Sequence, residues 1–456
     1  MEHGALTSDV VVIGAGFAGL SAAVRLAAAG RSVVVCEEGP RLGGRATAFT
    51  DRETGERVDN GQHVLFGCYR ETYAFLRELG TDGLAPLQRR LAVTMADTSG
   101  RSARLVCPPW PPPAHLFGGV LRWRALSLRD RLRATKLRRF LAEVRRDGPA
   151  AAAARVPEGD TVSGWLTRHG QTGRLRDWLW DPLAVAALNQ SPDTAAARAF
   201  ARVLGELFGP RIEDSSIGVP MVPLDELYAE PARAWLERRG GVVLTRSPAR
   251  VKTADGAAGP IVVTAGGRRI EAQAVISSVP WHALGRIWDG EPPGALRQTL
   301  ADAAATGSSP IVTVNLWFDG PVMTDPFVGL VGGPMHWVFD KSAIFGTAAG
   351  HLSIVASGAR ELAAMDNAAI TREAIAHLMQ ALPGAASRTL VRSVVVREQR
   401  ATFSLAPGAA PRPAARTAVP GVYLAGDWTD TGLPGTIEGA VRSGHLAAGL
   451  VLESLQ

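Results

Sequence analysis

The chain has 456 residues, of which 46% are hydrophobic and 20% charged, so it is long enough for two domains with a sizeable core. Its 49 basic and 43 acidic residues give a formal charge of +6. This charge would suit binding to nucleic acid or to anionic lipid, and charge alone does not distinguish these partners. The three cysteines lack CxxC spacing and the nine histidines are scattered, so we expect a reducing compartment and no disulfide framework or metal site.

No basic segment of the secretory type precedes the first apolar run, and no stretch of about 18 uncharged apolar residues occurs. We therefore expect a cytoplasmic protein without a membrane span.

A strand, a glycine-rich turn and a helix are predicted at residues 9–29. The run VVVI at residues 10–13 is apolar and β-branched, which is typical of a buried parallel strand. It leads directly into GAGFAG, and strong helix formers follow to residue 29. This order of elements is typical of a dinucleotide-binding turn.

The residues of this turn have separable roles. Gly14 permits the tight turn, Gly16 lets the backbone approach a pyrophosphate, and Gly19 allows close packing of helix against strand. The phosphates would bind the free N–H groups at the start of the helix, where Phe17 and Ala18 lie.

The second predicted strand ends in an acidic residue, and a glycine-arginine segment follows it. Glu37 is spaced to accept hydrogen bonds from a ribose, and Arg45 offers a planar fork for a phosphate. Gly43 and Gly44 remove side chains where backbone passes a ligand. With Arg41, these residues match the E-x-x-x-R-x-G-G-R pattern of the FAD-dependent amine oxidase and phytoene desaturase superfamily, which the chain resembles.

The segment after this motif carries a D-x-G pattern and a histidine. The resemblance implies that Asp59 and Gly61 pass beside the flavin ring, and the string NGQHVLFG resembles one branch, the hydroxysqualene dehydroxylases. Gln62 and His63 are therefore candidates to face the cofactor and the substrate. A hydrogen-bonded structural histidine is the alternative for His63.

Residues 110–146 combine bulky apolar side chains with many arginines. Ser127 is the predicted N-cap of a helix that places Leu128, Leu132, Leu137, Phe140, Leu141 and Val144 on one side. Such a segment suits a helix lying in a membrane interface, or a cap-domain helix with a solvated arginine face. No nucleic-acid recognition motif accompanies the charge, so we expect no nucleic-acid partner.

Helices are also predicted at residues 161–169 and 174–188. The string WDPLAVAALN at residues 180–189 again resembles the hydroxysqualene dehydroxylases. Its aromatic side chains either pack in the core or line an apolar tunnel, and Asn189 either caps the helix or contacts ligand.

The chain then returns to the nucleotide domain from residue 224. The resemblance assigns Val251 to a strand whose backbone reads the adenine edge, and it assigns residues 268–279 to a strand leading back into the FAD domain. Relatives that oxidise amines usually carry a lysine on the strand predicted at 311–318. No lysine occurs between residues 308 and 320, which counts against an amine oxidase. Residues 336–341 either line the substrate cavity or form a strand edge over the core.

The C-terminal segment GVYLAGDWTDTGLPGTIEGAVRSG carries a second cofactor motif. The resemblance implies that Gly426 and Asp427 hold the ribityl and pyrophosphate part of FAD. The helix that starts at Thr436 and Ile437 would place N–H groups near the flavin N1/O2 edge, where reduced flavin carries negative charge. No cysteine follows residue 107, so we expect non-covalent FAD.

The predicted fold is α/β, with a doubly wound Rossmann-like FAD domain interleaved with a mixed-sheet α+β substrate domain and a helical cap. The expected FAD domain comprises residues 1–85, 224–290 and 415–456. The expected substrate domain comprises residues 86–223, which include the helical part, and 291–414.

The resemblance implies a reductive enzyme of squalene and hopanoid biosynthesis that removes the allylic hydroxyl of hydroxysqualene. His63, and after it Asp430, are the candidate proton donors. The expected partners are a lipid-soluble isoprenoid substrate, the inner face of the cell membrane through residues 110–146, and an unidentified electron donor. A carotenoid-type desaturase and a flavin-binding scaffold in a terpenoid assembly are the alternatives.

Overall fold

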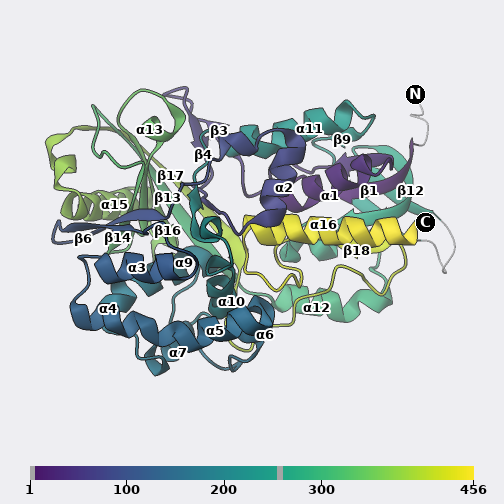
Figure 1. The fold of residues 1–456 in the computed structure, drawn as a ribbon. Helices are drawn as coiled ribbons and strands as arrows, with labels where there is room; N and C mark the ends of the chain where they lie inside the picture. The colour runs from purple at the N-terminus through teal and green to yellow at the C-terminus, as the bar shows by residue number, and fades with distance from the viewer. Residues whose placement is uncertain (1–5, 254–259) are drawn as a thin grey trace.

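The computed structural model describes residues 6–253 and 260–456. Two seven-stranded sheets and a helical cap make up the molecule (Figure 1). No helix in the described ranges is both long and apolar enough to cross a bilayer.

The first sheet is built around the first strand of the chain. β1 (Leu6–Ile13) pairs in parallel with β2 (Val33–Cys36) on one side and β12 (Arg268–Ser277) on the other. β9 (Val242–Leu244) extends the sheet beyond β2, and β18 (Val422–Leu424) pairs in parallel with the end of β12. β10 (Ala249–Lys252) and β11 (Ile261–Ala265) continue from the start of β12 as antiparallel strands. Strands from three separate stretches of sequence therefore share this sheet.

Successive side chains of β1 point to opposite faces of the sheet, and helices cover both faces. Val10 and Val12 pack in a core with α1 (Phe17–Ala28), α11 (Glu230–Glu237) and α16 (Ile437–Ser454). Val11 and Ile13 pack on the opposite face, with side chains that include α12 (Arg297–Ala305). Figure 1 shows α16 alongside α1 over the sheet. This burial on both faces accounts for the continuous apolar run.

The second sheet lies beside the first and is mostly antiparallel. Its order is β17 (Leu390–Phe403), β13 (Ser308–Phe318), β16 (His351–Ser357), β15 (Trp337–Asp340), β14 (Phe327–Val331), β6 (Ala92–Asp97) and β7 (Ser102–Val106), with only β14 and β6 parallel. α15 (Asn367–Ala381) covers one face, where it buries Val312, Val314 and Leu316 of β13. The cap lies on the other side of the sheet in Figure 1.

The cap comprises short helices between residues 114 and 207. They are α3 (Ala114–Arg122), α4 (Leu128–Ala134), α5 (Arg138–Asp147), α6 (Pro149–Ala154), α7 (Val162–Arg168), α8 (Gly173–Leu175), α9 (Asp181–Leu188) and α10 (Ala197–Leu207). The helices predicted at 161–169 and 174–188 are confirmed, the second with a π-helical turn at 176–180.

The predicted helix after Ser127 is partly wrong. Ser127 does cap α4, because its hydroxyl accepts from Asp130 N at 3.2 Å. A 3-10 turn at Thr135–Leu137 then separates α4 from α5. The step of five residues from Leu132 to Leu137 also turns a helix by about 140°, so the two sets of apolar residues lie on different faces. Leu137 and the apolar residues of α5 are buried, whereas Leu128 and Leu132 are 69% and 56% exposed.

The remaining elements connect these layers. They are β3 (Ala48–Thr50), β4 (Arg57–Asp59), β5 (Leu65–Phe66), α2 (Arg70–Leu79), β8 (Ile217–Gly218), α13 (Lys341–Phe345) and α14 (Arg360–Ala363), together with short 3-10 and π-helical turns.

Candidate active site

A cavity of about 970 Å³ lies where the two sheets and the cap meet. One half of it is bounded by the glycine-rich turns of the first sheet, and the other half by apolar side chains of the cap and second sheet. Fifteen of the predicted site residues line this cavity: Gly14, Gly16, Phe17, Ala18, Glu37, Gly43, Gly44, Arg45, Gly61, Gln62, His63, Gly426, Asp427, Thr436 and Ile437.

The glycines of the first turn are needed for two different reasons. Gly14 has φ +100°, and a Cβ at Gly19 would lie 2.0 Å from the carbonyl oxygen of Gly14, so both positions exclude a side chain for reasons of local backbone packing. At Gly16 an added Cβ would meet no protein atom nearer than 3.9 Å. The protein itself therefore leaves room at Gly16, and that room opens into the cavity.

Glu37, directly after β2, forms hydrogen bonds that stabilise the turn between β1 and α1. Its carboxylate accepts from Ala15 N at 2.9 Å and from Gly39 N at 2.7 Å. These two bonds hold the carboxylate at the edge of the cavity, beside the turn between β1 and α1.

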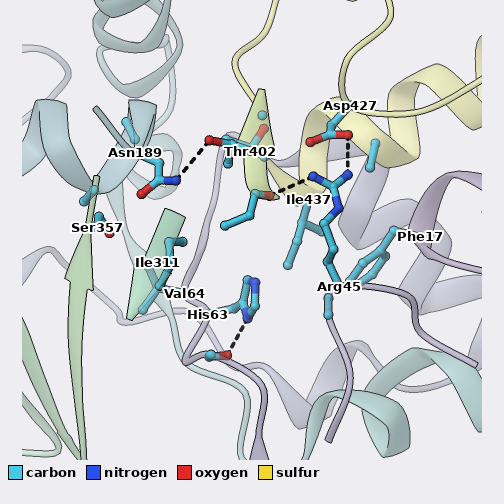
Figure 2. Close-up of a pocket in the computed structure, with 18 of the residues that line it drawn as sticks. Phe17, Arg45, His63, Val64, Asn189, Ile311, Ser357, Thr402, Asp427 and Ile437 are labelled. Carbon is cyan, nitrogen blue, oxygen red and sulfur yellow. Dashed lines mark hydrogen bonds and ion pairs between the residues drawn. The ribbon is translucent and has the colours of Figure 1, made fainter. Parts of the chain in front are cut away.

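Arg45 and Asp427 form an ion pair across the cavity wall (Figure 2). Arg45 donates to Asp427 Oδ1 at 2.5 Å and to the carbonyl oxygen of Ala401 at 2.7 Å. Burial lowers the pKa of Arg45, but the attraction of Asp427 and Glu398 outweighs burial and raises it overall. The guanidinium is therefore a fixed positive charge that joins three distant segments of the chain.

His63 lies between the two halves of the cavity. Figure 2 shows it between the Arg45–Asp427 pair on one side and Asn189 and Ser357 on the other. Its Nδ1 is 2.7 Å from the carbonyl oxygen of Gly61, which can only accept a hydrogen bond, so Nδ1 carries a proton. Burial lowers the pKa of His63, so the ring is neutral at pH 7 and Nε2 is a hydrogen-bond acceptor.

The loop that carries His63 is held from behind by a buried lysine. Lys341, at the start of α13 and 1% exposed, donates to Asp59 Oδ2 at 2.8 Å and also to Gln62 Oε1. The other carboxylate oxygen of Asp59 accepts from Leu224 N at 3.0 Å. Asp59, expected beside the flavin ring, therefore does not line the cavity, because both of its oxygens are engaged within the protein.

Comparison with known proteins identifies the family. The model for flavin containing amine oxidoreductases matches residues 17–452. Hydroxysqualene dehydroxylases of Sinorhizobium fredii and Rhodopseudomonas palustris are each 31% identical to this chain, over 98% of it and 99% of their own length. The chain belongs to the flavin-containing amine oxidoreductases, in the hydroxysqualene dehydroxylase branch.

More distant relatives agree with this placement. A 15-cis-phytoene desaturase of Narcissus pseudonarcissus is 25% identical over 98% of this chain and 80% of its own length. A putrescine oxidase triple mutant with redesigned cofactor binding superposes with a TM-score of 0.72 at 21% identity, covering 99% of this chain and 100% of that one. At that identity the likeness shows the fold alone, and it confirms the predicted pairing of an FAD domain with a substrate domain.

Members of this family use FAD, and the cavity fits that cofactor. The open position at Gly16 lies next to Gly44, whose added Cβ would meet Gly16 Cα at 3.5 Å, so two loops without side chains face each other. The N-terminus of α16 opens on the same cavity, with the Thr436 hydroxyl accepting from Gly439 N at 3.1 Å. Two loops of exposed backbone and a helix N-terminus are the donor set that a pyrophosphate and a reduced flavin require.

Three other predicted residues lie away from the cavity. Arg41 is exposed, and Asp430 is exposed and 3.5 Å from Arg412, so Asp430 is not placed to protonate a substrate there. Gly19 is buried in the turn, as its packing role requires.

The backbone of Val251, predicted to contact the adenine, is engaged within the protein. The backbone N–H and C=O of Val251 are bonded to Ile287 O and Asp289 N at 2.7 and 2.9 Å, so they are not free for a base. Because strand groups on one edge recur every second residue, Ala249 presents its backbone on that edge two positions earlier. Ala249 lines the cavity.

The substrate half of the cavity is apolar and rich in aromatic side chains. The sequence leaves open whether the aromatic side chains of residues 180–189 and 336–341 pack in the core or line the cavity, and in the structure they line it. Trp180, Trp337 and Phe339 line the cavity, whereas Lys341 does not. Several lining residues carry no sequence motif and were missed: Tyr69, Leu105, Ile311, Phe327, Val355 and Glu398.

Proposed function

We propose that this flavoprotein removes the allylic hydroxyl of hydroxysqualene to give squalene. The observation that carries the proposal is one continuous cavity with the FAD motifs at one end and an aromatic, apolar chamber at the other. Full-length relatives of the same branch support this substrate over others.

The overall change belongs to reductive chemistry at a carbon that bears a hydroxyl. When bound, reduced FAD would supply the hydride for that carbon and become oxidised, while the oxygen would leave as water after taking up one proton. The chain must hold the hydrocarbon, orient the hydroxyl and keep bulk water from the electron-poor carbon.

The cap walls suit the binding of an electron-poor hydrocarbon. Phe117, Trp178 and Trp180 line the chamber, and the face of an aromatic ring attracts positive charge. Because the walls carry few polar atoms, an allylic cation formed there meets little nucleophilic water.

His63 is proposed to orient the hydroxyl rather than to protonate it. Its Nδ1–H is committed to Gly61 O, so the free Nε2 accepts a hydrogen bond from the substrate O–H. This differs from the role of proton donor predicted for His63, because a neutral ring in this tautomer has no proton to give from Nε2.

The direction of electron flow separates this function from its main alternative. We expect the protein reduced with dithionite to convert hydroxysqualene into squalene, detected by mass spectrometry of the extracted lipid. The oxidised protein should leave phytoene unchanged. Desaturation of phytoene without squalene formation would assign the chain to the carotenoid-type desaturases, and absence of both activities would favour a scaffold role.

We also propose that the cap docks on an anionic membrane, from which the lipid substrate enters. At the end of β7, Leu105 and the following Cys107 line the cavity, while Val106 between them is exposed. On α3, Phe117 and Val120 line the cavity while Leu121 is exposed. One thin layer of structure therefore separates the chamber from an outer apolar surface.

Positive charge surrounds this outer surface. Leu128 and Leu132 project from α4, and exposed arginines stand on the neighbouring turns at positions 122, 124, 138 and 139. Exposed apolar side chains amid basic ones suit insertion at an anionic headgroup layer.

Flotation with phosphatidylglycerol vesicles tests the docking. We expect the wild type to float, and either Leu128→Ser with Leu132→Ser, or glutamine at the four arginines, to reduce flotation at least several-fold. Val391→Ser is the matched control, because Val391 is 70% exposed on β17, in the second sheet. Flotation that the cap variants leave unchanged would defeat the docking proposal.

A further inference from the structure

A second cavity of about 650 Å³ lies directly behind the first. It is enclosed by α2, α9, α10 and the first half of α16. The two cavities share seven lining residues, so a single layer of side chains separates them: Phe66, Tyr69, Leu183, Ala186, Ala187, Leu207 and Thr436.

The inner wall of the second cavity is apolar. Beyond the shared layer it is lined by side chains such as Cys68, Val203 and Leu433. These residues come from the loop before α2, from α10 and from the loop before α16, and none of the three lines the first cavity.

Three of the charged groups that line the second cavity, Glu438, Glu71 and His445, are engaged in hydrogen bonds within the protein. The buried carboxylate of Glu438 accepts from Thr72 N and Oγ1 at 2.9 and 2.7 Å and from Glu71 N at 3.0 Å. His445 Nδ1 lies 2.7 Å from Glu71 Oε2. Arg25 and Arg70, which also line this cavity, are exposed, and Glu438 is the buried charged residue among the lining residues.

The volume of the first cavity alone is small for FAD and a triterpene substrate together. Pockets of about 300–1,000 Å³ usually serve one drug-sized ligand. Here about 970 Å³ must take a dinucleotide together with a triterpene. Hydroxysqualene bears its hydroxyl near the middle of its chain, so a carbon placed at the flavin has two long prenyl arms that leave in different directions.

We propose that the second cavity is a subsite for the second prenyl arm of the substrate. In this arrangement, which rests on the proposed function, one arm lies in the cap chamber and the other passes the Tyr69 layer into the second cavity. The hydroxyl-bearing carbon then stays near His63, and a molecule with a single arm has no use for the second cavity.

Binding of two hydrocarbon probes tests this subsite without requiring turnover. Squalene carries both arms and farnesol carries one, and their dissociation constants can be measured by perturbation of the flavin absorbance of the holoprotein. Val203→Trp places an indole in the second cavity only. We expect it to weaken squalene by about tenfold or more, since losing the burial of about two methylene groups has that effect. Farnesol affinity should change by less than about twofold.

Two comparison variants make the result specific. Val391→Trp adds the same side chain at an exposed position on β17 and should alter neither ligand. Val120→Trp fills the cap chamber and should weaken both ligands. Unchanged squalene binding in Val203→Trp, or an equal loss for squalene and farnesol, would overturn the second subsite.

Failure of the subsite and failure of the proposed function are distinguishable. If Val203→Trp converts hydroxysqualene as fast as the wild type, the second subsite is wrong and the dehydroxylase function stands. If the wild type shows the expected binding pattern but never forms squalene, the two-armed site stands and the reaction is wrong.

Discussion

Single atoms decide the chemistry at two positions of the cavity, Gly16 and His63. At Gly16 the absence of a side chain leaves space for the cofactor. The protein does not fill that space, since the nearest protein atom to an added Cβ is 3.9 Å away. At His63 the partner matters, because Gly61 O fixes which ring nitrogen carries the proton.

Gly16→Val should lose FAD without unfolding the chain. The added methyl groups would occupy the space of the pyrophosphate, so we expect FAD affinity to fall on the order of 100-fold, measured by flavin fluorescence during titration of the apoprotein. Gly449→Val is the control, because a Cβ at that position of α16 meets nothing within 4 Å and Gly449 does not line the cavity. Equal FAD affinity in both variants would refute the role given to Gly16.

The protonation state of His63 predicts a particular pH dependence. Because burial lowers the pKa of His63 below its ordinary value, the neutral ring predominates at pH 6.5 and above. His63→Leu should slow single-turnover squalene formation by about tenfold, the value of one hydrogen bond. The shape of the pH–rate profile should stay the same. A wild-type rate that falls above pH 6.5, with a fall that His63→Leu removes, would instead make His63 the proton donor.

At the scale of elements, α13 anchors the loop between β4 and β5 to the second sheet. The ion pair of Lys341 with Asp59 is the anchor, and its side chains are 1% and 4% exposed. The strand segment at 308–320, where relatives that oxidise amines usually carry a lysine, has none. Lys341 comes from a different element, and its long side chain reaches the back of the loop that carries His63.

Lys341→Met should destabilise the protein strongly because it leaves the Asp59 carboxylate buried without its cation. We expect a loss of about 3–5 kcal/mol in the free energy of unfolding, measured by urea denaturation. The double variant with Asp59→Asn should recover part of that loss. Arg233→Met breaks the exposed pair with Glu237 and should cost no more than about 0.5 kcal/mol. Similar costs for Lys341→Met and Arg233→Met would show that the buried pair is no anchor.

At the scale of the whole molecule, local sequence patterns predicted most of the cofactor half. Each cofactor feature belongs to a local motif that the sequence alone reveals. These features are the glycine-rich turn, Glu37, Arg45 and the start of α16, and each of them contributes residues to the cavity wall. Asp59 does not line the cavity, whereas the next residue, Asn60, does, because one residue of shift on a strand reverses the direction of every group. The backbone of Val251 faces the expected edge, but it is bonded to Ile287 and Asp289.

The substrate half was less predictable because no local pattern marks it. Ile311, on a strand whose alternate residues pack under α15, turns toward the cavity only because the cap lies on that face. Such features arise from packing between distant segments, which single-sequence periodicity does not encode.

The whole molecule should also be acid-sensitive through two neighbouring histidines. Ser357 N donates to His336 Nδ1 at 3.0 Å and Met335 N donates to His377 Nδ1 at 3.3 Å, so each ring must keep a free lone pair. Burial, together with His377, lowers the pKa of His336 to about 4. An unfolded histidine titrates near 6.5, so between about pH 6.5 and 4 only the unfolded chain binds this proton.

Stability should therefore fall as the pH falls through that window. The contribution of His336 is at most about 1.4 kcal/mol per pH unit, and His336→Asn should remove it because the amide oxygen can accept from Ser357 N. Urea denaturation at pH 7.5, 6 and 5 measures the slope. Parallel slopes for wild type and His336→Asn would show that His336 does not titrate in this way.

The central claim, that this cavity uses reduced FAD to remove a hydroxyl, is tested most directly by the stoichiometry of a single anaerobic turnover. The purified holoprotein would be photoreduced, mixed with hydroxysqualene in detergent, and followed by flavin absorbance while the lipid is extracted and quantified. We predict that each flavin reoxidised yields one squalene. A flavin that stays reduced with hydroxysqualene, while the oxidised protein is bleached by a polyene precursor, would contradict the account and reverse the direction of electron flow.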